Sequence, residues 1–387
     1  MENRISGKFI QDRNHFLLGE WFFLVIIHKS VYNEISVIVK IGEREAQMGM
    51  RRFLLLGILA VFFLSGCGSG EGTENIKPQI VRAKAEKTNS ALLTVGFIQT
   101  GKESDWRDAN TNDFLETFTR DKGYNLIYID GNSDPKRQVK AAYDLIGQNV
   151  DYIIIDPIVE SGWEDVFLEA EQKGIPVIVS DRQVDVNASH YACWVGSDFH
   201  KEGVNAMKWL EKYLEDQGRQ EDEIKIVLLE GTEGATATIG RTEGLYEQID
   251  LHPNWKVVAK ECGNFTQGEG TEVMEEILNR QIEFDVVIAE NDNMMFGAMK
   301  AMEQQGIAFG RDTDIITISF DALREALAKI IGGELMVSVE CNPLIAGLSE
   351  KAIQDLEKGK RIEKIHFVQE SVFTRENTVV NLLNRKY

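Results

Sequence analysis

The segment that decides the fold begins with Leu92-Leu93-Thr94-Val95-Gly96-Phe97-Ile98, an apolar run rich in β-forming residues. A run of this kind predicts a buried strand. We expect a helix over residues 109–122 and a second strand over 125–129. Asp134 and Pro135 then provide a helix N-cap and a proline at the first helical position. Strand and helix therefore alternate from the beginning of this region.

The same alternation continues almost to the end of the chain. Apolar runs predict further strands at residues 152–155, 176–179, 192–195, 225–229, 255–260, 286–289, 315–319 and 336–339. Amphipathic spacing predicts helices at residues 135–150, 163–173, 199–214, 241–249, 271–280, 294–305, 323–330 and 344–356. These strands are more than one open twisted sheet comfortably holds. We therefore predict an α/β fold of two doubly wound parallel-sheet lobes.

An export signal precedes this region. Arg51-Arg52 is followed by an apolar run over residues 53–64 and by Leu64-Ser65-Gly66-Cys67. The run is shorter than the roughly 20 residues of a spanning helix, and its flanks are typical of a secretory signal. The last four residues resemble a bacterial lipobox, whose cysteine carries the lipid. A buried core helix before a cysteine is the alternative. We expect an extracytoplasmic lipoprotein anchored to the membrane at Cys67.

The segments around this signal follow from the same reasoning. Signal peptides begin close to the initiator, and Met48 and Met50 lie directly before Arg51. We therefore expect residues 1–49 to be a start-site artefact and residues 50–66 to be the signal peptide. Residues 67–90 are rich in Gly, Glu, Thr and Lys, which predicts a polar tether.

Composition excludes several classes of function. The formal net charge of −20 repels nucleic-acid phosphate, so we expect no nucleic-acid partner. Cys193, Cys262 and Cys341 lack CxxC spacing, which predicts neither a disulfide framework nor a metal site, and we expect all three to be small buried residues. The sequence contains no Walker loop, no HExxH and no GxSxG elbow after a strand. We therefore predict a protein that is not an enzyme and needs no cofactor.

Candidate ligand contacts follow the predicted strands, because ligands of open α/β sheets bind at the carboxyl ends of strands. The residues there supply carboxylates, guanidiniums, an amide and one tryptophan. The main candidates are Glu103, Ser104, Trp106, Arg107, Asp181, Arg182, Arg241, Asn291 and Asp321. Phe265, Glu340 and Asn342 are further candidates, although Phe265 fits a wall or core position better than a direct contact.

This set of side chains suits a neutral, polyhydroxylated ligand. A sugar hydroxyl both donates and accepts, so an adjacent carboxylate and guanidinium, as in Asp181-Arg182, satisfy it together. Trp106, which we expect in a loop, offers a flat wall for the apolar face of a sugar ring. Arg107, Arg241, Asp181 and Asp321 leave the site nearly neutral, whereas a phosphate would require excess positive charge.

Some of these features have purely structural alternatives. Asp181-Arg182 is compatible with a solvated surface pair, and Trp106 with a core position. Asn291 is compatible with a helix cap, which does not exclude ligand contact. The segment Asp130-Gly131-Asn132-Ser133-Asp134 suggests a calcium loop, but it lacks the bidentate glutamate, so we expect a turn and a helix cap.

Several motifs together recur in a known family, although each alone is weak. They are Glu103-Ser104-Asp105-Trp106-Arg107-Asp108-Ala109-Asn110, Val159-Glu160-Ser161-Gly162-Trp163, Asp181-Arg182-Gln183-Val184-Asp185, Gly196-Ser197-Asp198-Phe199, Asn291-Asp292, Glu340-Cys341-Asn342-Pro343 and Glu370-Ser371-Val372-Phe373-Thr374. On these motifs, the chain from about Thr94 to Asn377 resembles the type I periplasmic sugar-binding proteins of ABC importers, and within them the galactofuranose-binding branch. It departs from that branch at Asp105, where a small residue is usual, and at Phe320, where an aliphatic residue is common.

The resemblance implies roles for these residues. The sugar contacts of the N-terminal lobe would be Glu103, Ser104, Trp106, Arg107, Asp181 and Arg182, and those of the C-terminal lobe Arg241, Asn291 and Asp321. The N-terminal lobe would comprise residues 91–197 and 342–370, and the C-terminal lobe residues 198–341 and 371–387. Three crossings would join the lobes near Gly196 to Asp198, near Cys341 and near Ser371.

The implied mechanism is hinge closure around a monosaccharide, galactofuranose or a related sugar. A monomeric, lipid-anchored binding protein would then deliver the sugar to an ABC permease. The alternative is a sensory module whose closed form is read by a membrane histidine kinase. A transcriptional regulator of similar fold should carry a helix-turn-helix where the signal and tether lie. A carbohydrate-processing enzyme is a more distant alternative.

Overall fold

The computed structural model describes residues 92–387. The expected start-site artefact, signal peptide, polar tether and lipidated Cys67 lie within residues 1–90, outside the described residues. Within 92–387, no helix is both long and apolar enough to cross a membrane.

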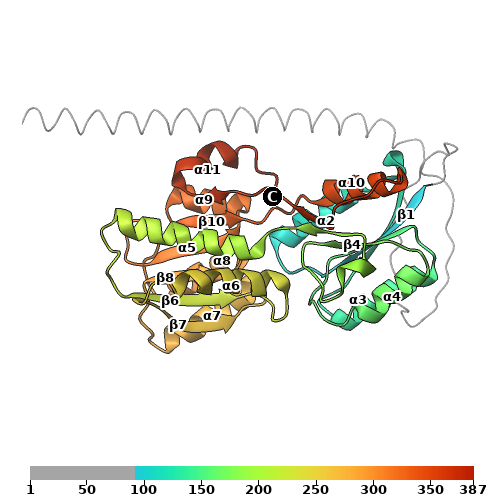
Figure 1. The fold of residues 1–387 in the computed structure, drawn as a ribbon. Coiled ribbons are helices and arrows are strands. Elements are labelled where there is room, and N and C mark those ends of the chain that lie inside the picture. Colours follow the sequence, from blue (N-terminus) through green and yellow to red (C-terminus); the bar gives the residue numbers. More distant parts are fainter. Residues whose placement is uncertain (1–91) are drawn as a thin grey trace, which may run out of the picture. The chain divides into compact units, whose positions relative to one another are not determined.

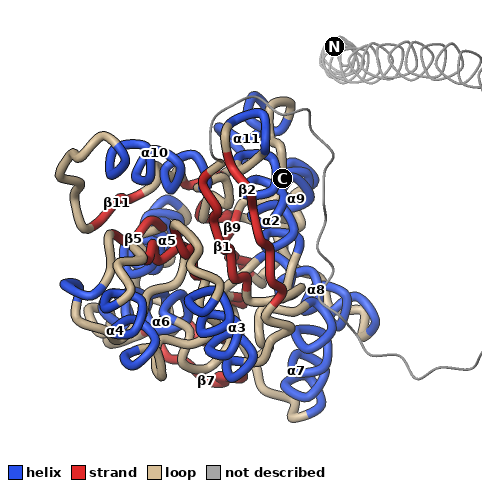
Figure 2. Tube along the Cα trace, turned by 90° about the vertical axis from the view of Figure 1, so that its right-hand side faces the viewer, coloured by secondary structure: helices blue, strands red, loops and turns tan. Residues whose placement is uncertain are grey.

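The first of two sheets is formed mainly by the N-terminal half of the described chain. Its strand order is β11 (Ile365–Phe367), β5 (Cys193–Gly196), β4 (Val177–Ser180), β3 (Tyr152–Ile155), β1 (Leu93–Gln99) and β2 (Tyr124–Asp130). All of its pairings are parallel. Figure 2 shows β1 and β2 running side by side. Strand β11, at one edge of this sheet, follows much later in the chain than the other five strands.

The second sheet has the same construction. Its strand order is β12 (Val372–Phe373), β10 (Val337–Glu340), β9 (Ile316–Asp321), β8 (Val286–Ala289), β6 (Ile224–Glu230) and β7 (Trp255–Cys262). Its pairings are parallel except for β12, which runs antiparallel to β10 at the edge. The predicted α/β class with two doubly wound parallel sheets is confirmed.

Helices cover both faces of each sheet. The first sheet packs against α2 (Asp105–Thr117) and α10 (Ala346–Glu357) on one face and against α3 (Pro135–Gly147) and α4 (Glu164–Gln172) on the other. One face of the second sheet packs against α5 (Phe199–Asp216) and α6 (Thr236–Ile249). The other face packs against α7 (Gln267–Asn279), α8 (Asp292–Gln304) and α9 (Arg324–Gly332). Helix α11 (Arg375–Leu382) lies beside α9. In Figure 1 the red helix α10 lies among the blue and green elements of the first sheet.

Strand β3 shows why these sheets are buried on both faces. Tyr152 and Ile154 belong to the cluster beneath α2 and α10, while Ile153 and Ile155 belong to the cluster beneath α3 and α4. Successive side chains of a strand point to opposite faces, so an unbroken apolar run has a partner on each side. Each fully buried isoleucine contributes about 1.5–3 kcal/mol.

The chain passes between the two sheets three times. The crossings are β5 to α5, β10 to α10 and β11 to β12. They lie where the family resemblance implied them, near Gly196 to Asp198, at Cys341 and beside Ser371. We call these three segments the hinge. Because every crossing follows a strand end, the hinge lies at the carboxyl edge of the sheets.

The start of α2 differs from its prediction. The helix begins at Asp105, four residues before the predicted start, because Ser104 accepts a hydrogen bond from the Arg107 amide at 3.2 Å and caps it. The prediction that Trp106 lies in a loop is therefore wrong: Trp106 occupies the first turn of α2. The predicted C-terminal end is also too long, since residues Arg120–Lys122 form a separate 3-10 turn.

Three elements were not predicted, for reasons visible in their burial. Ile365 and Phe367 of the edge strand β11 are exposed, and β12 has only two residues. Helix α11 exposes Val379 and Val380, so its apolar residues do not form one buried stripe. Short or exposed elements carry little hydrophobic periodicity.

Two smaller predictions have clear outcomes. Asp134 caps α3 by accepting a hydrogen bond from the Lys136 amide at 2.9 Å, which confirms the helix cap in the segment that suggested a calcium loop. Cys193 and Cys341 are buried as predicted, but the same prediction is wrong for Cys262, which is exposed. Cys262 ends β7, an edge strand, where its thiol lies 3.0 Å from the Gly231 carbonyl oxygen and 3.4 Å from Asn264 Oδ1.

Candidate functional site

A cavity lies where the carboxyl ends of the two sheets meet. Its lining is formed by Glu103, Ser104, Trp106, Arg107, Asp181, Arg182, Phe199, Ala237, Arg241, Phe265, Asn291, Asp321 and Cys341. About 300 Å³ of the space inside is not occupied by atoms, part of it open to solvent. Every main candidate from the sequence lines this cavity, and so does Phe265. Their contact with a ligand stays a prediction.

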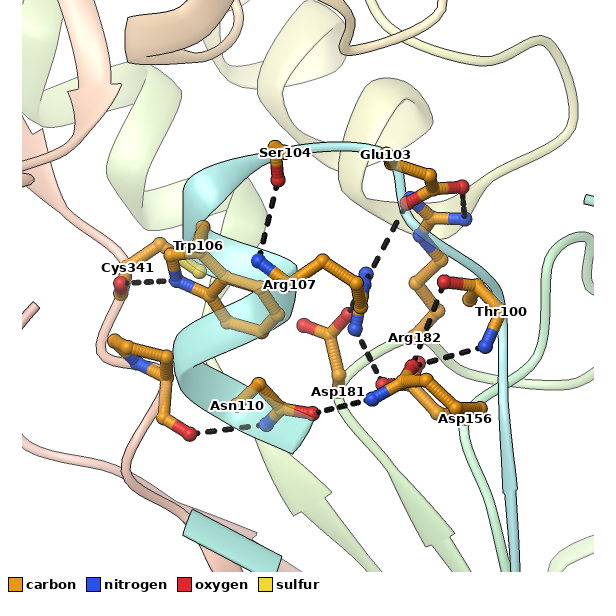
Figure 3. Close-up of polar contacts among 12 residues, drawn as sticks. Thr100, Glu103, Ser104, Trp106, Arg107, Asn110, Asp156, Asp181, Arg182 and Cys341 are labelled. Carbon is orange, nitrogen blue, oxygen red and sulfur yellow. Dashed lines mark hydrogen bonds and ion pairs between the residues drawn. The ribbon is translucent and has the colours of Figure 1, made fainter. Parts of the chain in front are cut away.

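Arg107 is the centre of a carboxylate network on the first sheet. Its guanidinium pairs with Asp156 at the end of β3, with Asp181 at 2.9 Å and with Glu103 at 3.5 Å. Figure 3 shows these groups converging beneath the first turn of α2. Burial lowers the pKa of Arg107, but the three carboxylates together outweigh burial and raise it. Arg107 is therefore a permanent cation.

Burial acts in the opposite direction on its partner. Asp156 is completely buried, and burial raises its pKa well above the usual value despite the attraction of Arg107. Its carboxyl group pairs with Arg107 Nη1, which agrees with a role in holding the arginine. Asp156 is absent from the cavity lining. We therefore regard it as a positioning residue for Arg107.

Arg182 and Glu103 form a bidentate pair next to this network. The distances from Arg182 Nη1 and Nη2 to the two Glu103 oxygens are 3.2 and 2.7 Å. Arg182 Nη1 also donates to the Ile158 carbonyl at 3.1 Å, and its guanidinium carbon lies 5.1 Å from the centre of the Phe265 ring. A guanidinium that donates two hydrogen bonds to one carboxylate is held in a single orientation, so this pair is preorganised.

Trp106 forms an aromatic wall that is fixed at one edge and covered on one face. Its Nε1 donates to the Cys341 carbonyl at 2.6 Å, which joins α2 to the hinge. The Arg107 guanidinium carbon lies 4.6 Å from the ring centre. A ring held in this way keeps its face in one plane, as stacking against an apolar sugar face requires.

On the second sheet, Arg241 is a buried arginine at the centre of a network of acidic groups, as Arg107 is on the first. Its Nε donates to Glu202 at 2.7 Å, its Nη1 donates to the Glu290 carbonyl, and its Nη2 lies 3.6 Å from Asp321. Burial lowers the pKa of Arg241, but Glu202 and the other anionic groups outweigh it and raise the pKa. Burial raises the pKa of Asp321 well above its usual value.

Asn291 is both a helix cap and a part of the cavity wall. Its Oδ1 accepts from the Met294 amide at 2.9 Å, and its Nδ2 donates to the Phe265 carbonyl at 2.9 Å. The predicted cap is confirmed. Its Nδ2 carries a second hydrogen, which has no acceptor within residues 92–387 and could donate to a ligand.

The backbone at the cavity adopts unusual conformations. Asp181, Phe265 and Asp321 have φ values of 58°, 61° and 102°, which non-glycine residues rarely adopt. Such conformations cost on the order of 1–3 kcal/mol each and cluster at functional sites. Three strained positions around one cavity therefore support its functional role.

The electrostatic composition of the cavity is balanced. Glu103, Asp181 and Asp321 face Arg107, Arg182 and Arg241, so three carboxylates accompany three guanidiniums. Arg107 Nε lies 3.5 Å from Glu103 Oε2, while the buried Arg182 Nε has no hydrogen-bond partner within residues 92–387.

The structure separates two of the lower-ranked candidates from the cavity. Neither Glu340 nor Asn342 is part of its lining. Glu340 accepts from the Ser371 amide at 2.9 Å and pairs with Arg385, while Asn342 Oδ1 accepts from the Leu344 amide at 3.0 Å. The Glu340 side chain instead joins the second and third crossings, and the Asn342 side chain forms a local turn in the second.

Sequence reasoning missed three lining residues. Phe199 is the first residue of α5, Ala237 lies in the first turn of α6, and Cys341 follows β10 directly. Each stands just after a strand or crossing, so position alone would have indicated them. Cys341 was expected to be a small buried residue, and Phe199 and Ala237 carry no polar group that would mark a ligand contact.

A buried group of possible metal ligands lies under the cavity at the hinge. Ligand atoms of Glu202, Cys341 and Glu370 lie within 4.8 Å of one another. Arg241 already pairs with Glu202, and burial raises the pKa of Glu370 to about 9 and that of the Cys341 thiol well above its usual value. Bound protons and Arg241 thus balance the charge, and we assign this group to the hinge.

Comparison with known proteins places these observations in a family. Residues 95–355 match the family model described as periplasmic binding protein domain. The chain is 35% identical over 302 residues to the galactofuranose-binding protein YtfQ of Escherichia coli (strain K12), which covers 77% of this chain and 92% of that protein. It is 31% identical to the ribose import binding protein RbsB of Bacillus subtilis (strain 168), over 65% of this chain and 77% of that protein.

Solved structures agree with this match. The binding component of the arabinose ABC transporter from Shewanella sp. ANA-3, bound to α- and β-L-arabinofuranose, superposes with a TM-score of 0.71 at 34% identity. A Mycobacterium smegmatis protein in complex with β-D-fucofuranose gives 0.72 at 36% identity. Each comparison covers 76% of this chain and 95% of the other.

Proposed function

The chain belongs to the family of periplasmic binding proteins, and from this premise we propose that it captures a monosaccharide in its cavity and delivers it to an ABC permease. The relatives named above are binding proteins rather than enzymes, which agrees with the prediction that this chain makes and breaks no bond. The identification as a type I sugar-binding family member is confirmed by the family match and the fold.

The observation that carries the proposal is the balanced charge of the cavity. Three carboxylates and three guanidiniums, held by one another, present many fixed donors and acceptors but little net charge. A phosphate or a carboxylate ligand would find each guanidinium already paired with a carboxylate, so the cavity offers no excess positive charge to bind it. A neutral sugar instead satisfies paired donors and acceptors with each hydroxyl, while Trp106, Phe199 and Phe265 supply apolar walls.

The ring form that we propose is a furanose. Three of the similar proteins bind galactofuranose, arabinofuranose or fucofuranose by their names, and each shares at least 34% of its aligned residues with this chain. We propose galactofuranose or a related pentose or hexose furanose as the ligand.

Binding would proceed by hinge closure. We propose that residues 91–197 with 342–370 move as one lobe against residues 198–341 with 371–387. Direct contacts between these parts support a closed arrangement: the Glu160 amide donates to the Gly234 carbonyl at 3.1 Å, and the Gln183 amide donates to Thr236 Oγ1 at 2.7 Å. A sugar that contacts both lobes stabilises the closed form, and the permease would read that form.

The location is part of the same proposal. We propose a monomer tethered to the outer face of the membrane by lipid on Cys67, so that it stays beside its permease. A Cys67→Ser variant would then appear in the medium or periplasm instead of the membrane fraction. Membrane retention of that variant would contradict the anchor but leave the sugar proposal intact.

Binding can be tested with the purified protein and a panel of neutral sugars. We would measure thermal unfolding with D-galactose, L-arabinose, D-fucose and D-ribose, with galactose 1-phosphate as the charged control. A neutral ligand at 100 times its Kd should stabilise the protein by about 2.7 kcal/mol, and the phosphate should not. No shift with any neutral sugar, or a larger shift with the phosphate, would contradict the proposed function.

The ring form needs a separate measurement. The anomeric carbon of [1-¹³C]galactose has different chemical shifts in its furanose and pyranose forms. We expect the bound sugar to show the furanose signal. A bound pyranose would overturn the furanose assignment while leaving monosaccharide binding in place.

A further inference from the structure

Within residues 92–387, hydrogen bonds join the two lobes at two places outside the hinge. One is the pair of bonds at Glu160 and Gln183 described above, both of which use backbone donors. The other joins Asp105 of α2 to Asn293 of α8 through two bonds. Asn293 Nδ2 donates to Asp105 Oδ2 at 2.9 Å, and the Asp105 amide donates to Asn293 Oδ1 at 3.3 Å.

This pair does not touch the ligand space. Ser104 and Trp106 on either side of Asp105 line the cavity, as does Asn291 two residues before Asn293, but Asp105 and Asn293 do not. Asn293 is nearly buried, while Asp105 remains exposed to solvent at the outer side. The pair therefore lies immediately outside the cavity wall and joins the two elements that carry it.

The carboxylate has a specific electrostatic setting. Asp105 is the first residue of α2, and Asn293 is the second residue of α8. The N-terminal ends of two helices, both carrying partial positive charge, thus approach each other across the lobes. A carboxylate between them offsets this repulsion, which an uncharged side chain of the same shape does less well.

We propose that Asp105 and Asn293 form a latch that stabilises the closed form and thereby slows ligand dissociation. The inference rests on the proposed function, because a latch has an effect only if closure retains a ligand. An interaction present only in the closed form shifts the opening equilibrium and leaves the approach of the ligand to the open form unchanged. Its removal therefore changes koff rather than kon. Asp105 is one of the two positions at which this chain departs from the galactofuranose-binding branch, and the latch gives a reason for an aspartate there.

The test compares four variants with the unmodified protein by stopped-flow kinetics, with D-galactose as the probe. Asp105→Ala should increase koff about tenfold, the equivalent of about 1.4 kcal/mol, while kon changes less than twofold. Asp105→Asn keeps the shape of the side chain but loses its charge and should give an intermediate koff. Asn293→Ala should match Asp105→Ala, and the double variant should add little to either.

A matched control separates the latch from a general loss of charge. Asp108 lies in the same first turn of α2 and is exposed, so Asp108→Ala removes the same charge without the lobe contact. It should leave koff unchanged. Asp105→Ala with the koff of the unmodified protein, or with a lowered kon instead, would overturn the latch.

The outcomes also distinguish the two proposals. If the unmodified protein binds D-galactose and the latch variants do not differ from it, the latch alone fails. If the unmodified protein binds none of the neutral sugars, the proposed function fails and the latch fails with it. Additive effects of Asp105→Ala and Asn293→Ala would show two independent residues instead of a pair.

Discussion

The indole Nε1 of Trp106 donates a hydrogen bond to the carbonyl oxygen of Cys341 at 2.6 Å, across a sequence separation of 235 residues. This bond ties the first turn of α2 to the second crossing of the hinge. The cavity wall and the hinge are therefore one mechanical unit, so a change in hinge geometry moves the surface that we propose to contact the ligand. Several of the following predictions depend on this coupling.

Trp106→Phe should weaken sugar binding and remove an optical signal. The variant keeps an aromatic face but loses the bond to Cys341, a cost of about 1 kcal/mol in stability. We expect a roughly fivefold to tenfold larger Kd in calorimetry, because the wall is no longer fixed. A sugar-dependent change in tryptophan emission, present in the unmodified protein, should disappear. A variant that keeps both the affinity and the emission change would contradict this role.

Arg182→Ala and Asp321→Ala should each abolish the thermal shift caused by a neutral sugar. Arg182 presents its fork next to Glu103, and Asp321 lies opposite Arg241, so each variant removes a fixed polar partner from one side of the cavity. We expect an affinity loss of at least 100-fold, about 2.7 kcal/mol, with the ligand-free protein still folded by circular dichroism. Arg137→Ala, at an exposed position of α3, is the control. Unchanged affinity in both test variants would mean that the site is misplaced.

Gly231→Ala should displace the aromatic wall on the second sheet. A Cβ at this position would lie 2.0 Å from the Phe265 ring, so the ring must move. Overpacking of this kind costs typically 1–3 kcal/mol in stability, and the moved ring should reduce affinity about tenfold. Gly268→Ala, where a Cβ meets nothing within 4 Å, serves as the control: affinity should stay unchanged and stability should not fall, because alanine suits the first turn of α7 at least as well as glycine. Equal behaviour of the two alanine variants would contradict the role of Phe265.

The stability of the protein should fall with rising pH because of Glu370. Burial, followed by repulsion from Glu202, raises the pKa of Glu370 to about 9 from an ordinary value of 4.5. Between these values the folded form keeps a proton that the unfolded chain has released, so the stabilisation is complete below pH 4.5 and is lost as pH rises toward 9. One such group changes the free energy of unfolding by at most about 1.4 kcal/mol per pH unit.

Glu370→Gln provides the check on that slope. An amide does not titrate, and it still accepts from Ser197 Oγ and from the Asn342 amide, the two bonds that join the three crossings. Urea unfolding at pH 5, 7 and 9 should therefore show a shallower loss of stability in the variant. Parallel pH profiles for the two proteins would rule out Glu370 as the source.

Sequence patterns predicted the strands and the positions of the main candidate residues well. An apolar run such as Tyr152 to Ile155 has no plausible alternative to a strand buried on both faces, and residues that follow such strands must share one edge of a sheet. The start of α2 was harder, because a cap such as Ser104 is a local hydrogen bond with no hydrophobic period. The edge strand β11 and helix α11 expose their apolar residues, so they carry no hydrophobic periodicity from which they could be predicted.

The contacts around the cavity could not be derived in this way. Nothing local to Arg107 indicates that Asp156, 49 residues away, would bind its guanidinium, and nothing local to Asp105 indicates Asn293, 188 residues away. Glu340 and Asn342 carry suitable chemistry at a suitable strand end, yet their side chains are engaged in the hinge.

The sequence by itself determined the α/β class, the two sheets and the edge at which polar side chains gather, because hydrophobic periodicity and strand direction are local properties that survive any tertiary arrangement. Only the tertiary structure decided which carboxylate pairs with which arginine, which candidates line the cavity, and which residues join the lobes across it. Those pairings depend on three crossings that bring distant segments together, and their energies depend on burial, which no stretch of sequence specifies alone.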